Sequence, residues 1–189
     1  MRLKPNTLIV VAGPTASGKT ALAIQIAKAV DGEIVSADSM QIYRGVDIAT
    51  AKPTPEELAA VPHHLIGFLP MDRAFSVADY AELARKEIND ILSRGKVPVL
   101  CGGTGLYIKA IVDNVQYSEA ITGDEALRER LRQLAEREGN DALWRRLEAM
   151  DPETAKRIHP NNVGRVIRAI EVMTVSGKSC LLYTSPSPR

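Results

Sequence analysis

The stretch from Thr7 to Ala27, TLIVVAGPTASGKTALAIQIA, places a glycine-rich turn between two apolar runs. Leu8 to Ala12 is β-branched or aliphatic, which predicts a strand buried on both faces of a parallel sheet. Ala21 to Val30 is largely apolar and rich in alanine, which predicts a helix packed on that sheet. A buried strand that leads through a tight turn into a helix indicates the α/β fold class.

The turn has the spacing G-x-x-x-x-G-K-[ST] of a phosphate-binding loop. Backbone N–H groups in such a loop, at the N-terminus of a helix, point at an anion. A lysine and a threonine at its end would neutralise phosphate oxygens and hold Mg²⁺, respectively. The alternative is a glycine-rich turn that precedes a helix by chance. The predicted phosphate-binding residues are Gly13, Pro14, Thr15, Ala16, Ser17, Gly18, Lys19 and Thr20.

The composition of the 189 residues, 45% hydrophobic and 25% charged, is typical of a soluble domain with an elaboration. The net charge of +1 gives no sign of a nucleic-acid partner. Cys101 and Cys180 are too few and too far apart to indicate a disulfide framework or a metal site. We find no membrane-spanning run and no signal peptide, and therefore expect a cytoplasmic protein, acting as a monomer without membrane contact.

The rest of the first half continues the alternation of strands and helices. We expect a strand over 33–37, a loop over 45–62 with a short helix from Pro55, a helix over 76–94, a strand over 97–101 and a turn over 102–105. Ser76 and Asp79 have the spacing of a capping box. Such alternation implies right-handed crossovers and a parallel sheet.

The second half has helical periodicity. Helices are expected from Thr122, with Glu125 completing a capping box, over 140–150, from Asp151-Pro152 to about His159, and over 163–175. The tail is dominated by Ser, Pro and Thr and predicts no regular element. We therefore divide the chain into an α/β core over 1–116, a helical segment over 117–178 and an irregular tail over 179–189.

Asp38 follows the second strand, at the edge of a parallel sheet where ligands bind. Its carboxylate could accept a proton or hold a metal-bound water, and the alternative is that it caps the next turn. The third strand, within PVLCGGTG (98–105), carries no acid where an ATPase usually has a metal-binding aspartate. The sequence therefore argues against a hydrolysing motor and favours transfer of a group from a phosphate ester.

Four segments carry a family resemblance: GPTASGKT (13–20), SADSMQIYRGVDIATAKP (36–53), PVLCGGTGLYIKA (98–110) and RIHPNNVGRVIRAIEV (157–172). In this order and at these distances they resemble the bacterial tRNA dimethylallyltransferases, also called tRNA isopentenyltransferases. The resemblance implies a P-loop NTPase-like parallel sheet with flanking helices, and an all-helical insertion domain that binds tRNA.

The resemblance also implies a reaction. The loop would hold the diphosphate of dimethylallyl diphosphate rather than ATP, and the five-carbon group would pass to N6 of the adenine 3′ of the anticodon. Because the N6 lone pair is delocalised into the ring, the amine needs a base, and Asp38 is the candidate, with Thr104 as a second catalytic position. Lys19, the loop amides and Mg²⁺ bound through Thr20 would neutralise the departing diphosphate.

The implied partner is the anticodon stem-loop of tRNA, with the target adenine turned out of the stack. The matching positions are Asp38, Ser39, Met40, Gln41, Thr104, Arg128, Gly164, Arg165, Val166, Ile167 and Arg168. Thr104 could instead shape a turn, and Arg128 could belong to a solvated face. Arg165 and Arg168 share a helix edge with no acid expected opposite either, and could grip phosphates or be solvated.

Other residues are given structural roles. His63, His64 and His159 lack ligand spacing with any Cys or acid and are expected in loops or caps, and Trp144 is expected in the core. The family pattern is expected to break near Cys180, so that the strand completing the sheet and a further basic residue are missing. Two rival functions remain: a small-molecule kinase that shares the loop, and a phosphate-binding fragment without turnover.

Overall fold

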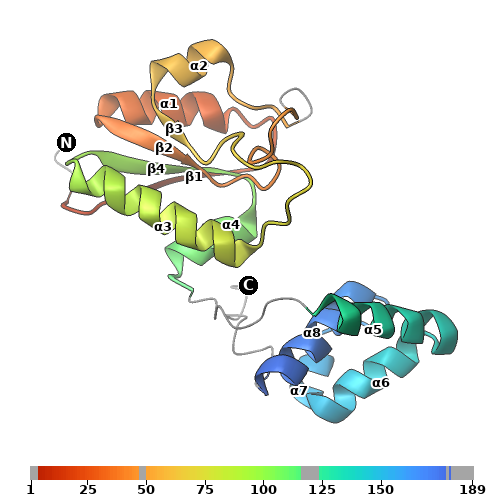
Figure 1. The fold of residues 1–189 in the computed structure, drawn as a ribbon. Helices are drawn as coiled ribbons and strands as arrows, with labels where there is room; N and C mark the ends of the chain where they lie inside the picture. Colours follow the sequence, from red (N-terminus) through yellow and green to blue (C-terminus); the bar gives the residue numbers. More distant parts are fainter. Residues whose placement is uncertain (1–3, 47–49, 116–123, 178, 180–189) are drawn as a thin grey trace. The chain divides into compact units, whose positions relative to one another are not determined.

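A computed structural model describes residues 4–46, 50–115, 124–177 and 179. The chain divides into two compact units, residues 1–116 and residues 117–189. Figure 1 shows that the first unit is a sheet with helices on both faces and that the second is helical. None of the helices in the described ranges combines the length and the apolar character needed to cross a bilayer.

The sheet of the first unit has four strands, all parallel. In spatial order they are β1 (Ile9–Ala12), β4 (Val97–Gly102), β2 (Gly32–Ser36) and β3 (His63–His64). In register, Val11 pairs with Cys101, and Cys101 pairs with Ser36 on its other side. The carboxyl ends of β1, β4 and β2 therefore lie side by side, which confirms the expected parallel α/β architecture.

The described residues of this unit form four helices: α1 (Lys19–Ala29), α2 (Pro55–Ala60), α3 (Val77–Ser93) and α4 (Gly105–Val112). Figure 1 shows α1 over one face of the sheet and α3 and α4 over the other. Successive side chains of the central strand β4 point to opposite faces of the sheet, because side chains alternate along a strand. Val99 packs with the α1 residues Ala23 and Ala27, whereas Leu100 packs with Tyr80 of α3 and Tyr107 of α4.

The expectation that the first strand is buried on both faces is wrong for β1, whereas β2 and β4 are buried on both faces. Val11 is buried, but its neighbour Val10 is 39% exposed. The reason is position, because β1 pairs with β4 alone among the described strands and lies at an edge of the sheet.

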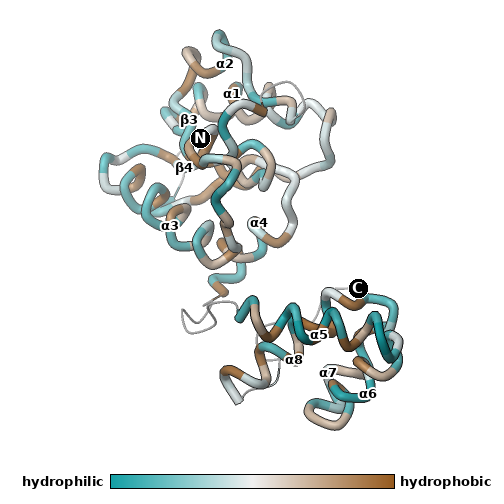
Figure 2. Tube along the Cα trace, turned by 45° about the vertical axis from the view of Figure 1, so that its right-hand side comes forward, coloured by the Kyte–Doolittle hydropathy of each residue, from teal (hydrophilic) through white to brown (hydrophobic). Residues whose placement is uncertain are grey.

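Local sequence signals correctly predicted the starts of α2 and α3. The side chain of Ser76 accepts from the Asp79 N–H and the Asp79 carboxylate accepts from the Ser76 N–H, so the predicted capping box is confirmed. Thr54 and Glu57 form a second capping box at the short helix that begins at Pro55. Figure 2 shows hydrophobic and hydrophilic positions alternating along α3, as expected for a helix with one face in the core.

The second unit contains α5 (Glu125–Glu138), α6 (Asn140–Met150), α7 (Pro152–Ala155) and α8 (Val163–Ser176). Its core is built from Leu127 and Leu131 of α5, Leu143 and Leu147 of α6, and a buried face of α8. Trp144 packs against this core, and its Nε1–H donates to the carbonyl oxygens of Ala155 and Ile158 at 3.2 and 2.8 Å. Trp144 is therefore a structural residue, as expected.

Two boundaries in this unit differ from expectation. The N-cap of α5 is Asp124, whose carboxylate accepts from the Leu127 N–H at 2.9 Å, so Glu125 is the first helical residue and not the partner of Thr122. Thr122 and residues 180–189 lie outside the described residues. The helix that begins at Pro152 ends at Ala155 and does not reach His159.

Candidate active site

Residues 13–20 form a tight loop from the end of β1 into α1. Gly18, the N-cap of α1, has φ +77°, a left-handed conformation that favours glycine. A Cβ on Gly13 would lie 3.0 Å from Oγ of Ser17, so the loop closes tightly on itself. Because this closure occurs at a helix N-terminus, free backbone N–H groups and the helix dipole favour an anion there.

The side chains of the loop add positive charge. Nζ of Lys19 donates to the carbonyl oxygen of Pro14 at 3.0 Å, and Oγ of Ser17 donates to the same oxygen at 2.8 Å. Within the described part of the chain, Lys19 forms no ion pair with an acid. Thr20 makes no hydrogen bond through its hydroxyl there, and it lines a small cavity. The other lining residues are Ile34, Ser36, Gln41, Pro53, His63, Ile66 and Cys101.

The turn after β4 approaches the loop closely enough to require glycine. The N–H of Gly13 donates to the carbonyl oxygen of Gly102 at 3.3 Å. A Cβ on Gly102 would lie 2.2 Å from the carbonyl oxygen of Ala37, and one on Gly103 would lie 3.1 Å from that of Gly13. Since those neighbours are backbone atoms, a side chain at Gly102 would push β4 and β2 apart where the site is built.

Asp38 directly follows this contact and is half-buried. Its Oδ1 accepts from the N–H groups of Met40 at 2.9 Å and Gln41 at 3.4 Å. The alternative of a turn-capping acid is therefore observed, and it is compatible with a chemical role, because both hydrogen bonds use one carboxylate oxygen. They fix the orientation of the other oxygen, Oδ2.

Thr104 joins the two turns. Its Oγ1 accepts from the Ser39 N–H at 2.9 Å and donates to Oγ of Ser39 at 3.2 Å. Its own N–H donates to the carbonyl oxygen of Ala37 at 3.0 Å. Thr104 is also the N-cap residue of α4, a helix that the sequence analysis did not anticipate. The Thr104 hydroxyl thus binds the turn that carries Asp38.

Gln41 is committed to internal contacts. Its Nε2 donates to the carbonyl oxygens of Thr50 and Ala51, each at 3.1 Å, and its Oε1 accepts from Oγ of Ser36 at 3.4 Å. Met40, in contrast, is 54% exposed. Of the predicted tRNA-contacting residues 38–41, Met40 therefore presents an exposed side chain, while Gln41 holds the following loop in place.

Cys101 is close enough to Lys19 and Asp38 for both charges to act on its thiol. Burial raises the pKa of its thiol, the positive charge of Lys19 opposes that change, and the negative charge of Asp38 adds to it. The thiol stays protonated at neutral pH and is no nucleophile. Cys101 lies at the end of β4, beside β1 and the loop that follows it. β4 therefore ends in Cys101 and Gly102, and not in a metal-binding acid.

The predicted tRNA contacts in the helical unit are partly corrected. Arg128 and Arg168 both form ion pairs with the fully buried Glu171, so the expectation that no acid faces Arg168 is wrong. Gly164 and Arg165 are exposed. The side chains of Val166 and Ile167 are buried in the core of the unit and are not available to a ligand.

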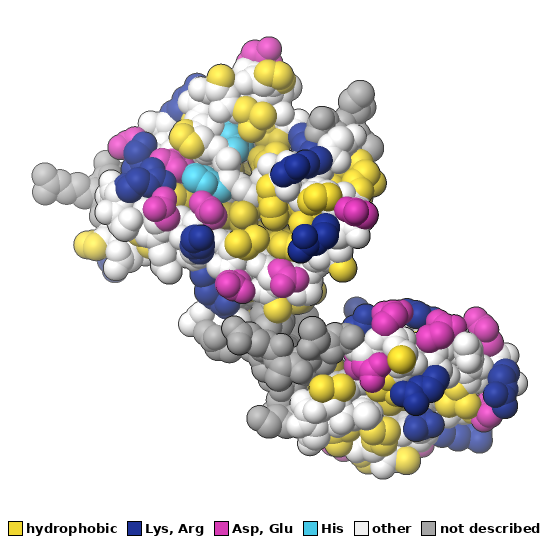
Figure 3. Space-filling model, in the orientation of Figure 1, with side chains coloured by type: hydrophobic (Ala, Val, Ile, Leu, Met, Phe, Trp, Pro, Cys, Tyr) yellow, Lys and Arg dark blue, Asp and Glu magenta, His cyan; other side chains and the backbone are white. Residues whose placement is uncertain are grey.

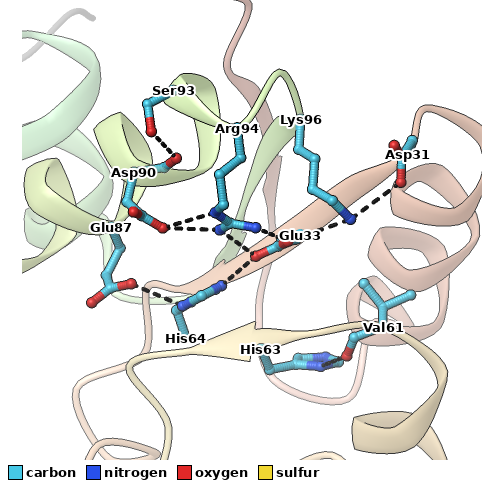
Figure 4. A network of polar contacts seen from close by, with 10 residues as sticks. All are labelled: Asp31, Glu33, Val61, His63, His64, Glu87, Asp90, Ser93, Arg94 and Lys96. Carbon is cyan, nitrogen blue, oxygen red and sulfur yellow. Dashed lines mark hydrogen bonds and ion pairs between the residues drawn. The ribbon is translucent and has the colours of Figure 1, made fainter.

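One charged cluster was missed entirely (Figure 4). The buried Glu33 of β2 receives Arg94 through both carboxylate oxygens and His64 of β3 at 2.8 Å. The other ring nitrogen of His64 lies 2.9 Å from the carboxylate of Glu87. His63 and His64 are therefore strand residues and not loop or cap residues, and of the two only His64 contacts acids among the described residues, whereas the Nδ1 of His63 lies 2.7 Å from the carbonyl oxygen of Val61. His159 lies outside the helices and strands, as expected. Hydrogen bonds from Arg94 lower the pKa of Glu33 to about 2, against the opposing effect of burial.

Comparison with known proteins identifies the family of the chain. The family model described as IPP transferase matches residues 41–187. A tRNA dimethylallyltransferase from Exiguobacterium sp. is 55% identical over 185 residues, which are 98% of this chain and 59% of the relative. That of Bacillus subtilis is 51% identical, over 91% of this chain and 54% of the relative. The chain spans little more than half the length of these curated relatives.

Two solved structures are also similar. The full-length tRNA isopentenylpyrophosphate transferase from Bacillus halodurans is 45% identical, with a TM-score of 0.59 over 92% of this chain and 57% of that one. A eukaryotic dimethylallyltransferase, solved while acting on tRNA, is 30% identical, with a TM-score of 0.77 over 91% of this chain and 42% of that one. By these matches over most of its length, the chain belongs to the IPP transferase family.

Proposed function

We propose that the protein transfers the dimethylallyl group of dimethylallyl diphosphate to N6 of the adenine 3′ of the anticodon in tRNA. The observation that carries the proposal is the convergence of the glycine-rich loop, Asp38 and Thr104 at the carboxyl ends of β1, β2 and β4. The names of the relatives point to the same reaction.

Residues 13–20 act, in this proposal, as a P-loop that holds the diphosphate, with residues 117–178 as a domain inserted into the core. The leaving diphosphate carries several negative charges, which must be neutralised before the carbon–oxygen bond breaks. Lys19, which no described acid neutralises, and the N-terminus of α1 supply positive charge at one point.

Mg²⁺ fits the oxygen groups at this point. The ion usually takes one or two protein oxygens together with substrate phosphates and waters. Thr20 offers a hydroxyl without a hydrogen bond among the described residues, in a cavity beside the loop. Bound there, Mg²⁺ would offset further charge on the diphosphate, while Lys19 and the loop amides hold its orientation.

Asp38 is the proposed general base. Its Oδ1 is fixed by the Met40 and Gln41 N–H groups, so Oδ2 is the atom to accept the N6 proton as the N6–carbon bond forms and diphosphate departs. Thr104 holds Ser39 and hence the turn. The exposed Met40 would pack on an adenine turned out of the anticodon loop.

The anticodon stem-loop is the proposed tRNA contact of the helical unit, through Arg128, Gly164, Arg165 and Arg168. We further propose that the protein acts as a monomer in the cytoplasm, without membrane contact. Sedimentation at assay concentration tests the monomer, and a dimer would overturn that part alone.

The function is tested by incubating the chain with tRNA and either dimethylallyl-labelled diphosphate or γ-labelled ATP. We expect the dimethylallyl label to appear on tRNA. Label from ATP on an acceptor would identify a kinase instead. Binding of the diphosphate with no transfer by any form of the protein would leave only a phosphate-binding domain, and would overturn the proposed reaction.

The Asp38→Asn variant tests the mechanism. The amide keeps the shape but cannot accept a proton, so single-turnover transfer should slow by about 10²–10⁴, with little change in tRNA affinity. A rate within about threefold of wild type would remove Asp38 as the base. Rescue at high Mg²⁺ would make it a metal-shell residue. Asp72→Asn, the same change at an exposed position of the same unit, is the matched control.

A further inference from the structure

The carboxylate of Glu171 is fully buried in the helical unit, between α8 and the start of α5. Its exposed fraction is 0%, although it is a charged group. Removing a carboxylate from water is costly unless its oxygens are fully hydrogen-bonded and its charge is paired. Hydrophobic packing therefore does not explain why a glutamate occupies this position.

Three hydrogen bonds and a further ion-pair contact reach the two oxygens of Glu171. Oε1 accepts from the Asp124 N–H at 2.8 Å and lies 2.9 Å from Nε of Arg128 in an ion pair. Oε2 accepts from Nη2 of Arg128 at 3.1 Å and from Nη1 of Arg168. Burial acts to raise the pKa of the Glu171 carboxyl, but the hydrogen bonds from Arg128 and then Arg168 hold it below its ordinary value. The group is therefore ionised at neutral pH.

The two arginines reach Glu171 from different helices and remain accessible. The Arg128 side chain is 31% exposed and the Arg168 side chain is 45% exposed. Arg168 uses only Nη1 toward Glu171, and no other hydrogen bond of its guanidinium occurs within the described residues. Its Nε–H and Nη2–H groups therefore remain for a ligand.

The cluster carries an excess positive charge at the surface. One buried carboxylate, that of Glu171, is paired with two guanidinium groups. The second acid near Arg128 is Glu125, whose side chain is 69% exposed and whose Oε2 lies 3.4 Å from Nη1 of Arg128, so this ion pair is weak. Figure 3 shows basic and acidic side chains intermixed over the visible face of this unit. The net charge of this surface therefore does not indicate RNA binding. The feature that does indicate it is the pair of guanidinium groups of Arg128 and Arg168.

We propose that Glu171 is a positioning residue that holds Arg128 and Arg168 side by side to bind a phosphate of the tRNA backbone. The proposal rests on the proposed function, because it names how that RNA is gripped. Arginine suits the task, since its planar fork binds phosphate oxygens in pairs once its orientation is fixed. A buried ion pair is by itself weak evidence for stability, which favours a positioning role.

For the Glu171→Gln variant, a pure charge effect and a positioning effect predict opposite changes in tRNA affinity. It makes the protein more positive by one charge, so electrostatics alone predicts tighter tRNA binding. Positioning predicts the reverse, because the glutamine NH₂ cannot accept from an arginine and both guanidinium groups lose their common anchor. We expect about tenfold weaker binding of an unmodified tRNA transcript at about 0.1 M salt, and a salt slope smaller by about one.

Two measurements separate positioning from a general loss of structure. A thermal melt reports whether the variant is folded, and the affinity for an unreactive dimethylallyl diphosphate analogue, bound in the other unit, should not change. Glu125→Gln is the matched control, because it removes the same charge beside the same Arg128 from an exposed position. It should leave tRNA binding unchanged or slightly tighter.

If Glu171→Gln does not fold, Glu171→Asp decides the question. It keeps the charge but shortens the reach toward the two arginines, so several-fold weaker tRNA binding with a reduced salt slope is expected. Wild-type affinity and slope in either folded variant would overturn the positioning role and leave the proposed function intact. Failure of the wild-type chain to bind tRNA would overturn the proposed function, and the phosphate site with it.

Discussion

Replacing Glu33 by glutamine should remove a pH-dependent part of the stability of the α/β unit. Glu33 is 3% exposed and is held by Arg94, His64 and Lys96. Hydrogen bonds from Arg94 lower its pKa from 4.5 to about 2. A carboxyl whose folded-state pKa is depressed stabilises the fold above its unfolded-state pKa and loses that effect as the pH falls through the folded-state value.

The size of the effect follows from that shift. A displacement from 4.5 to about 2 corresponds to roughly 3 kcal/mol of unfolding free energy at neutral pH. We therefore expect Glu33→Gln to be less stable than wild type by about that amount at pH 7. The difference should shrink between about pH 4.5 and pH 2, where wild-type Glu33 itself becomes protonated.

Urea unfolding over a pH series measures this difference, and the single tryptophan gives an internal reference. Trp144 lies in the helical unit, so its fluorescence follows that unit, whereas far-UV circular dichroism follows both. Glu33→Gln should shift the dichroism transition and leave the fluorescence transition in place. Glu82→Gln, at an exposed residue of α3, is the control. A wild-type-to-variant difference that is constant from pH 7 to pH 2.5 would refute the reasoning.

Three further changes are predicted. Lys19→Ala should weaken binding of an unreactive dimethylallyl diphosphate analogue about tenfold or more, because a charged donor to the diphosphate is lost; calorimetry that gives unchanged affinity would remove the loop from this role. Gly102→Ala should lower the free energy of unfolding by about 1–3 kcal/mol or more in urea titrations, because its Cβ would overlap the backbone of Ala37, and wild-type stability would contradict that close approach. Arg165→Ala should weaken tRNA binding and reduce its salt slope by about one, whereas an unchanged slope would return Arg165 to the solvated surface.

The parts of the site that the sequence predicted are those with short-range signals. The loop over 13–20 has fixed spacing, and the capping box at Ser76 and Asp79 joins residues three apart. The strand ending before Asp38 was likewise found from a short apolar run. In each case a few neighbouring residues determine the local backbone, so no knowledge of the tertiary fold is needed.

The charged clusters had no such signal. His64 meets Glu33 across 31 residues, Arg94 meets Glu33 across 61, and Arg128 meets Glu171 across 43. These partners are chosen by which strands and helices become neighbours. The exposure of Val10 depends on the same information, because a strand is buried on both faces only when neighbouring elements cover it.

The two edge strands of the sheet, β1 and β3, differ in how readily they could pair with another polypeptide. β3 is two residues long, so its outer side offers too few backbone groups to seed a further strand. Within the part of the chain that the structure describes, the four residues of β1 pair with β4 on one side and with no strand on the other, and Val10 of this strand is exposed. An extended segment could add there as a fifth strand. Aggregation of this chain through strand pairing at β1 should therefore depend on protein concentration and on refolding conditions. A charged residue at position 10 should reduce such strand pairing between chains.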